Sequence, residues 1–154
     1  MQFRLASITV VVGLVLFADP AAAIRQFIVF FAAGDAERLE EHTWAIGPEG
    51  DAVIAEAAEA FNAYHGGGTI IVVGRDQRVG AADLAYQRSC KRALAVKAAL
   101  VRHGVPENAV FAIGRGFTEL FIETAEGVKE PQNRNASIDL ASNAPTPAEL
   151  CAPS

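Results

Sequence analysis

The sequence has little of what metal sites, nucleic-acid binders and catalytic sites usually contain. Its 154 residues include two cysteines and three histidines, with no Cys-x-x-Cys pair or Cys/His cluster, so no metal or other cofactor is predicted. The net charge is −5 and no basic run occurs, which argues against nucleic acid as a partner. There is also no Gly-x-Ser-x-Gly motif and no visible nucleophile–base pair. These absences favour a binding or interaction protein over an enzyme.

The start of the chain is predicted to be a secretory signal peptide over residues 1–23. Arg4 supplies the positive charge, residues 8–17 form an apolar stretch, and the alanines at 21–23 offer a small-residue cleavage site. The apolar stretch is short for a membrane span, although an uncleaved anchor remains the alternative. We therefore expect an exported, soluble protein, which in a bacterium means the periplasm.

Strands and helices are predicted to alternate through a single domain over residues 24–141. The strands are expected at 24–33, 69–73, 108–113 and 136–140, and the helices at 48–64 and 83–103. Each helix has an apolar stripe at helical spacing, formed by Ile54, Ala57, Phe61 and Tyr64 in the first and by Ser89, Ala93, Val96 and Leu100 in the second. The order predicts an α+β fold: a two-layer β-α-β-α-β-β sandwich, a mixed four-stranded sheet with both helices on one face.

The Pro- and Ala-rich segment 142–154 is predicted to be a disordered tail. It contains Cys151, whereas Cys90 lies on the second predicted helix. In an oxidising compartment two cysteines usually pair, and a tail of this length reaches the helix. An intramolecular disulfide is slightly favoured, with free thiols or intermolecular pairing as the alternatives.

A polar turn, residues 75–78, follows the central strand and is the place where we expect function. Strand–helix folds place ligand-binding groups at such strand ends. Arg92, on the following helix, is spaced to point back at the turn. The alternative is a solvated turn with an ordinary surface arginine.

Residues 74–93, GRDQRVGAADLAYQRSCKRA, resemble the OmpA-like peptidoglycan-binding domain. That family's pattern is GHTD-x-x-G followed by YN-x-x-LS-x-x-RA-x-x-V. Without a gap, the matching positions are Gly74, Gly80, Ser89, Arg92, Ala93 and Val96. Residues 114–116 resemble the family's GxG, residues 126–134 its DGVREPQNRR ending and residues 27–39 its VFFDFDSAxL opening. The resemblance covers residues 25–141 and implies the same sandwich fold.

The resemblance also implies a ligand, the diaminopimelate residue of the uncrosslinked peptidoglycan stem peptide. In the family, an arginine pairs with the ligand's carboxylate and an aspartate pairs with its ammonium group. The arginine corresponds to Arg92, but the aspartate corresponds to Gln77, so the neighbouring Asp76 is the candidate substitute. Arg134, in the matching NRR ending, is the fourth candidate. The chain also departs from the pattern by Asp76 in place of threonine and Arg88 in place of leucine.

Two functions are therefore open. The first is a secreted domain that binds peptidoglycan non-covalently and anchors in the cell envelope. The second is the same fold with a decayed site, which binds an outer-membrane or other envelope protein. The position of Asp76 relative to Arg92 should help to separate the two, because a carboxylate turned to solvent would indicate decay.

Overall fold

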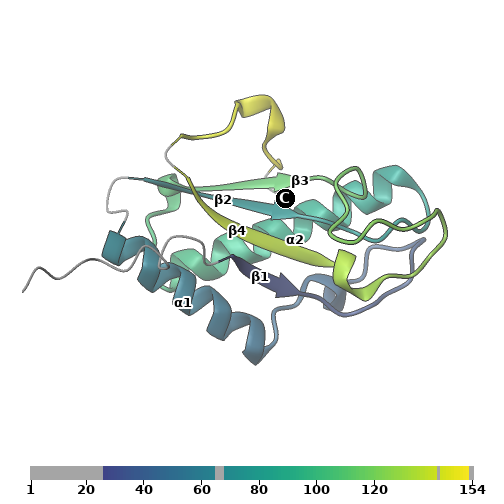
Figure 1. Ribbon diagram of the computed structural model, residues 1–154, viewed down its shortest axis with the longest axis horizontal. Coiled ribbons are helices and arrows are strands. Elements are labelled where there is room, and N and C mark those ends of the chain that lie inside the picture. Colours follow the sequence, from purple (N-terminus) through teal and green to yellow (C-terminus); the bar gives the residue numbers. More distant parts are fainter. Residues whose placement is uncertain (1–25, 65–67, 142, 153–154) are drawn as a thin grey trace, which may run out of the picture.

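A mixed four-stranded sheet forms the centre of the computed structural model, which describes residues 26–64, 68–141 and 143–152. The strands are β1 (Phe27–Phe30), β2 (Thr69–Gly74), β3 (Val110–Gly114) and β4 (Asn135–Ala141). Their order in space is β1-β4-β2-β3, as Figure 1 shows. β4 is antiparallel to both of its neighbours, and β2 and β3 are parallel. The predicted mixed sheet is confirmed.

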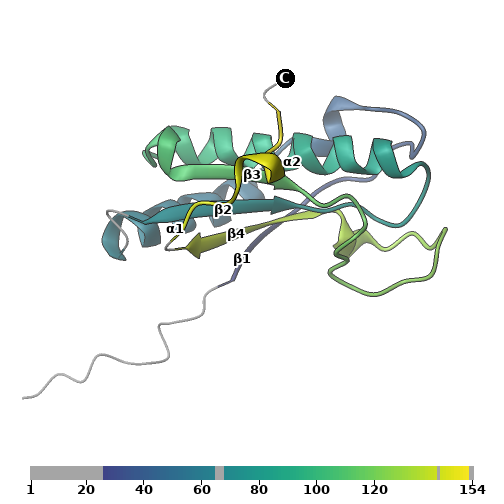
Figure 2. The same cartoon turned by 90° about the horizontal axis from the view of Figure 1, so that it is seen from above.

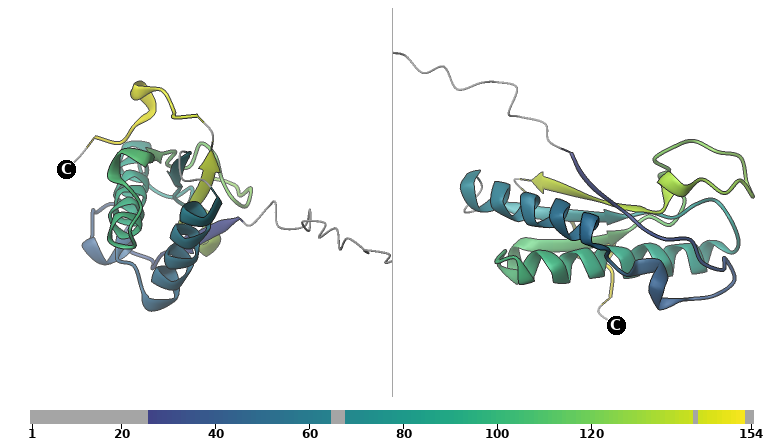
Figure 3. Two further views of the ribbon diagram at one scale, coloured as in Figure 1. Left: turned by 90° about the vertical axis from the view of Figure 1, so that its left-hand side faces the viewer. Right: turned by 90° about the horizontal axis from the view of Figure 1, so that it is seen from below.

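Two helices, α1 (Pro48–Tyr64) and α2 (Ala82–Arg102), cover one face of this sheet (Figure 3). α1 packs against β1, and α2 packs against β2 and β3. The apolar stripes read from the sequence are buried here, apart from Tyr64, whose side chain lies outside the described residues. Large apolar side chains of the core include Ile54, Phe61, Val96 and Leu100 from the helices, and Phe27, Val29, Ile70, Val72, Val110 and Ile138 from the strands. The α+β sandwich with both helices on one face is thus confirmed.

The segment between β1 and α1 is irregular apart from a short 3-10 helix, η2 (Glu41–Trp44). β1 is shorter than the predicted strand, and the chain leaves the sheet after Phe30. Thr43 is buried within η2, and Trp44 packs against the core. This segment, residues 31–47, lies over the end of the domain that carries the polar turn predicted from the sequence.

The C-terminal segment is held against β3 and α2, so the prediction of a disordered tail is wrong for residues 143–152. Cys151 forms a disulfide with Cys90, its N–H donates to Ala112 O at 2.9 Å, and Leu150 forms a β-bridge with Ile113. Figure 2 shows this segment crossing β3 towards α2. The local composition did not reveal the order, because the contacts that fix the tail are all distant in sequence. We call residues 146–151 the C-terminal strap.

The predicted signal peptide, residues 1–23, lies outside the described residues and stays a prediction. Within the described ranges, no helix has both the length and the hydropathy needed to cross a membrane.

Candidate functional site

The candidate site begins where β2 ends and α2 passes over it. Gly74 and Gly114 are partners on adjacent strands, and a Cβ on either would collide with α2 at Ser89. The Ser89 hydroxyl accepts a hydrogen bond from Gly116 N at 2.9 Å and donates one to Tyr86 O at 2.7 Å. The glycines therefore let α2 approach the strand ends closely, which brings its arginines to the polar turn.

Asp76, in this turn, has only 1% of its surface exposed and is fully paired. Its Oδ2 accepts a hydrogen bond from Arg88 Nε at 2.6 Å. Its Oδ1 accepts from Arg92 Nη1 at 3.0 Å and from the Gln77 backbone N–H at 3.0 Å. The carboxylate is therefore not turned to solvent, and both of its oxygens are occupied by groups of the chain itself.

Arg92 is the largest side chain that is almost completely buried. Besides Asp76, its guanidinium donates from Nε to Thr43 O at 3.0 Å and from Nη1 to Arg75 O at 2.8 Å. It also lies over the Phe31 ring, 5.7 Å from the centroid, a cation–π geometry. Burial lowers the pKa of Arg92, an effect that Asp76 opposes. The sequence predicted this arginine at the site, and the structure places it beside Asp76.

Arg134 and Gln77 form a second buried pair next to the first. Arg134 Nη1 donates to Gln77 Oε1 at 2.9 Å, and its Nε donates to Phe31 O at 3.3 Å. Burial lowers the pKa of Arg134, while the charges of Asp76 and Glu130 act in the opposite direction. The four residues named from the sequence, Asp76, Gln77, Arg92 and Arg134, are thus brought together at one end of the sheet.

Arg88 lies beside these four residues, although the sequence analysis did not name it as a site residue. It is 3% exposed and, besides its bond to Asp76, donates from Nη1 to Ala36 O at 2.8 Å. The sequence contained a signal for this ion pair. Asp76 and Arg88 both depart from the family pattern, and the joint presence of a new acid and a new base suggests that the two side chains pair. We call Arg88, Arg92 and Arg134, together with Asp76 and Gln77, the arginine cluster.

The arginine cluster carries more positive than negative charge. Three guanidinium groups surround one carboxylate, and all five side chains are at most 9% exposed. A buried charge without a partner is costly, so an anion bound beside these groups would stabilise them. The segment between β1 and α1, which covers the cluster, accepts hydrogen bonds from its arginines at four backbone oxygens, those of Phe31, Ala36, Arg38 and Thr43.

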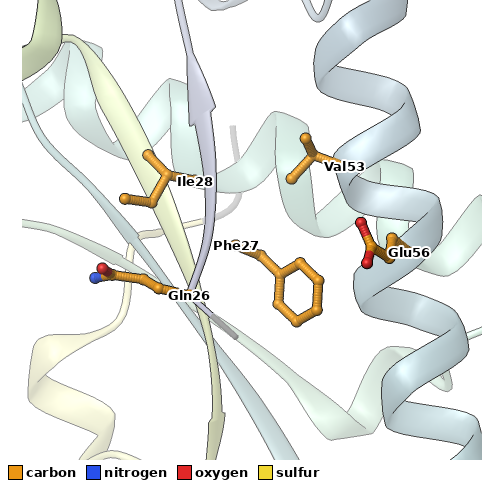
Figure 4. A pocket seen from close by; sticks show the side chains of 5 residues that line it. All are labelled: Gln26, Phe27, Ile28, Val53 and Glu56. Carbon is orange, nitrogen blue, oxygen red and sulfur yellow. The ribbon is translucent and has the colours of Figure 1, made fainter. Parts of the chain in front are cut away.

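A separate hollow lies between β1 and α1. It is lined by Gln26, Phe27, Ile28, Val53 and Glu56, as Figure 4 shows. None of these residues belongs to the arginine cluster, and the hollow is mostly apolar. Within the described residues, no group of three His, Cys, Asp or Glu side chains is placed to hold a metal ion.

The OmpA family model matches residues 40–134, which include the whole arginine cluster. The chain belongs to the OmpA family. No curated protein matches the chain. The arginine cluster lies inside the matched range, where β2 ends and α2 passes over it.

Solved structures with the same fold support the OmpA-family architecture. The peptidoglycan-associated lipoprotein from Burkholderia pseudomallei is 22% identical with a TM-score of 0.59, covering 74% of this chain and 87% of that one. The C-terminal domain of Helicobacter pylori MotB is 20% identical with a TM-score of 0.61, covering 79% and 88%. The OmpA-like domain of FopA1 from Francisella tularensis is 17% identical with a TM-score of 0.57, covering 77% and 75%. At these identities the similarity establishes the fold.

Proposed function

We propose that this OmpA-family chain binds peptidoglycan non-covalently through the arginine cluster, and that its role is binding rather than catalysis. The observation that carries the proposal is the burial of three guanidinium groups, those of Arg88, Arg92 and Arg134, around the single carboxylate of Asp76. The stem peptide of peptidoglycan is rich in carboxylates, and a guanidinium pairs with a carboxylate through two parallel hydrogen bonds. One structural relative is also named for its association with peptidoglycan.

Arg92 and Arg134 are the proposed anchors for the ligand. Arg88 is bound to Asp76 and to the covering segment, which makes it a positioning residue. Arg134 is the most exposed member of the cluster, at 9%, and its pairing with Gln77 is neutral. A carboxylate from outside would therefore meet Arg134 first and then compete for the inner guanidinium groups.

The proposed location is the periplasm, following export directed by residues 1–23. The disulfide between Cys90 and Cys151 supports this, because such bonds persist in oxidising compartments. An association with the outer membrane or with another envelope protein is part of the same proposal. The anchoring itself would be non-covalent.

A second candidate is an interaction module for an envelope protein, with the ligand site closed. Asp76 is not in the solvent-facing arrangement expected of a decayed site, but both of its oxygens are bonded and Arg92 is 1% exposed, so little of the pair is open to a ligand. In that case the arginine cluster is a structural network that ties the covering segment to α2. The two candidates differ in whether mutation of the cluster changes binding to peptidoglycan itself.

Sedimentation of the mature protein with diaminopimelate-type sacculi tests the proposal. We would compare wild type with Arg92→Ala and Arg134→Gln, and use Arg102→Ala, an exposed arginine of the same helix, as the matched control. The wild type and the control should pellet, while both cluster variants remain in solution with unchanged circular dichroism. If no form pellets, the interaction module is the better function. Equal pelleting of all four would place peptidoglycan binding elsewhere on the chain.

A further inference from the structure

We propose that the arginine cluster recognises its ligand through carboxylates alone and provides no partner for the ligand's ammonium group. The inference rests on the proposed function and specifies the ligand class of that same site. It predicts that stem peptides whose amine is acylated, as it is in a cross-link, bind as well as those with a free amine. The OmpA-like pattern implies the opposite preference, for uncrosslinked peptide.

Gln77 lacks the negative charge that an ammonium group would need. In the family pattern an aspartate stands at this position and offers acceptor oxygens to an ammonium group. Here the single acceptor of the side chain, Oε1, already receives a hydrogen bond from Arg134 Nη1 at 2.9 Å. The NH₂ group of Gln77 can only donate, and the carbonyl carries no charge. The substitution therefore replaces a charged acceptor by a neutral amide whose oxygen already faces a guanidinium group, so an ammonium group bound there would lie beside a like charge.

Asp76 does not replace the missing acid. Its two oxygens accept three hydrogen bonds from the chain, two of them from guanidinium groups. An ammonium group would have to displace Arg88 or Arg92 and would then lie beside the cation it displaced. Two like charges in a site with little water repel each other strongly. The exchange is therefore unfavourable.

Glu130 is the other carboxylate whose charge acts on the cluster, through Arg134. Its Oε1 accepts the Gln132 backbone N–H at 3.0 Å and so caps the short helix η4 (Pro131–Asn133). One oxygen of this carboxylate is thus used in holding the chain that carries Arg134, and its negative charge already acts on that guanidinium group.

Each arginine of the cluster keeps an unused donor group. Arg88, Arg92 and Arg134 use Nε and Nη1, whereas Nη2 of each makes no hydrogen bond with the described part of the chain. These groups and the Gln77 NH₂ group are all donors, and they are the side-chain polar groups of the cluster without a hydrogen bond in the described part of the chain. Carboxylate oxygens are acceptors, so a ligand carboxylate satisfies these groups and also balances the excess charge.

Binding of small probes to the mature protein tests the inference. The probe is N-acetyl-L-Ala-γ-D-Glu-meso-diaminopimelate, whose only ammonium is on diaminopimelate. A second form has that amine acetylated, and a third has the diaminopimelate carboxylates converted to amides. We expect the Kd values of the first two forms to agree within about twofold, and the amide form to bind about tenfold or more weakly.

Two glutamine variants sharpen this test. Gln77→Glu restores an acid and should make the free-amine probe bind about tenfold more tightly than the acetylated one. Gln87→Glu, an exposed position on α2, adds the same charge and should keep the wild-type ratio. The wild-type ratio is measured without any mutation, so it decides the inference even if Gln77→Glu fails to fold.

The outcomes separate the two proposals. If acetylation weakens wild-type binding about tenfold, the inference is wrong while peptidoglycan binding stands. If sacculi pellet the protein but no probe binds, the inference is wrong and the proposed function again stands. If neither sacculi nor probes bind, both are wrong.

Discussion

Arg88 Nε lies 2.6 Å from Asp76 Oδ2, and both side chains are almost completely buried. In the OmpA-like pattern these two positions carry leucine and threonine, so the chain has replaced an apolar and a neutral residue by a salt-bridged pair. Arg88 alone would bury a charge without its carboxylate, which is strongly destabilising, and Asp76 alone would have Arg92 as its one ion-pair partner among the described residues. The two departures from the family pattern are therefore best understood as one coupled change.

This coupling predicts the outcome of a double-mutant cycle with Asp76→Thr and Arg88→Leu. Each single change should destabilise the protein, and Asp76→Thr should cost more, about 3–5 kcal/mol, because it also leaves Arg92 unpaired. The double variant should be more stable than the sum of the two costs by about 1.5–3 kcal/mol, the value of a charged hydrogen bond. Urea unfolding of all four proteins measures this, and strictly additive costs would contradict the coupling.

Gly114→Ala tests the close approach of α2 to the sheet. A Cβ at this position would collide with Ser89 Oγ and Cys90 Sγ, so α2 would have to shift away from β3. We expect a loss of about 1–3 kcal/mol, as for other overpacked sites. Gly47→Ala is the matched control, since nothing lies within 4 Å of its Cβ position, and it should change stability by less than about 0.5 kcal/mol. Equal effects of the two substitutions would rule out the packing explanation.

The fold could be predicted because its signals are local. The β-branched run of β2 and the uninterrupted stripe of α2 each determine one element, and their order limits the topology. The pairing of Asp76 with Arg88 could not be read in this way, since the two residues are twelve positions apart on a turn and a helix. Their contact depends on how closely α2 approaches β2. The order of the C-terminal strap was missed for a similar reason, because Cys151 is 61 residues from its partner.

Reduction of the disulfide between Cys90 and Cys151 should destabilise the domain. A cross-link between residues separated by 61 positions lowers the conformational entropy of the unfolded chain. The chain-entropy relation gives a stabilisation of the folded state of about 4 kcal/mol. We expect the denaturant midpoint to fall on adding reductant, and the Cys90→Ala/Cys151→Ala variant to match the reduced wild type. A midpoint in the double variant that still falls with reductant would show that the effect is not due to this bond.

Acid should loosen the C-terminal strap before the rest of the domain. Hydrogen bonds from Thr146 and Arg115 lower the pKa of Glu149 below its ordinary value of 4.5. A carboxylate with a lowered pKa contributes stability above its unfolded-state pKa, and this is lost as the pH falls through the folded-state pKa. Amide exchange at Thr146, whose N–H donates to Glu149 Oε2, should therefore accelerate as the pH is lowered below 4.5, relative to intrinsic rates. Glu149→Gln should remove this acid dependence, whereas Glu107→Gln, in another 3-10 helix, should leave it unchanged.

Asn133 should control the order of the loop that leads to the arginine cluster. Its buried side chain accepts the Ile122 N–H at 2.7 Å and donates to Ile122 O at 2.8 Å, next in sequence to Arg134. Asn133→Ala removes both bonds, so we expect a loss of about 1–3 kcal/mol and faster amide exchange at Ile122. Gln132→Ala is the neighbouring control, because that exposed side chain makes no hydrogen bond within the described residues. If Asn133→Ala also weakens probe binding while Arg134 keeps its pairing with Gln77, the loop contacts the ligand directly. If binding is unchanged in a protein with a loosened loop, ligand contact is confined to the arginine cluster.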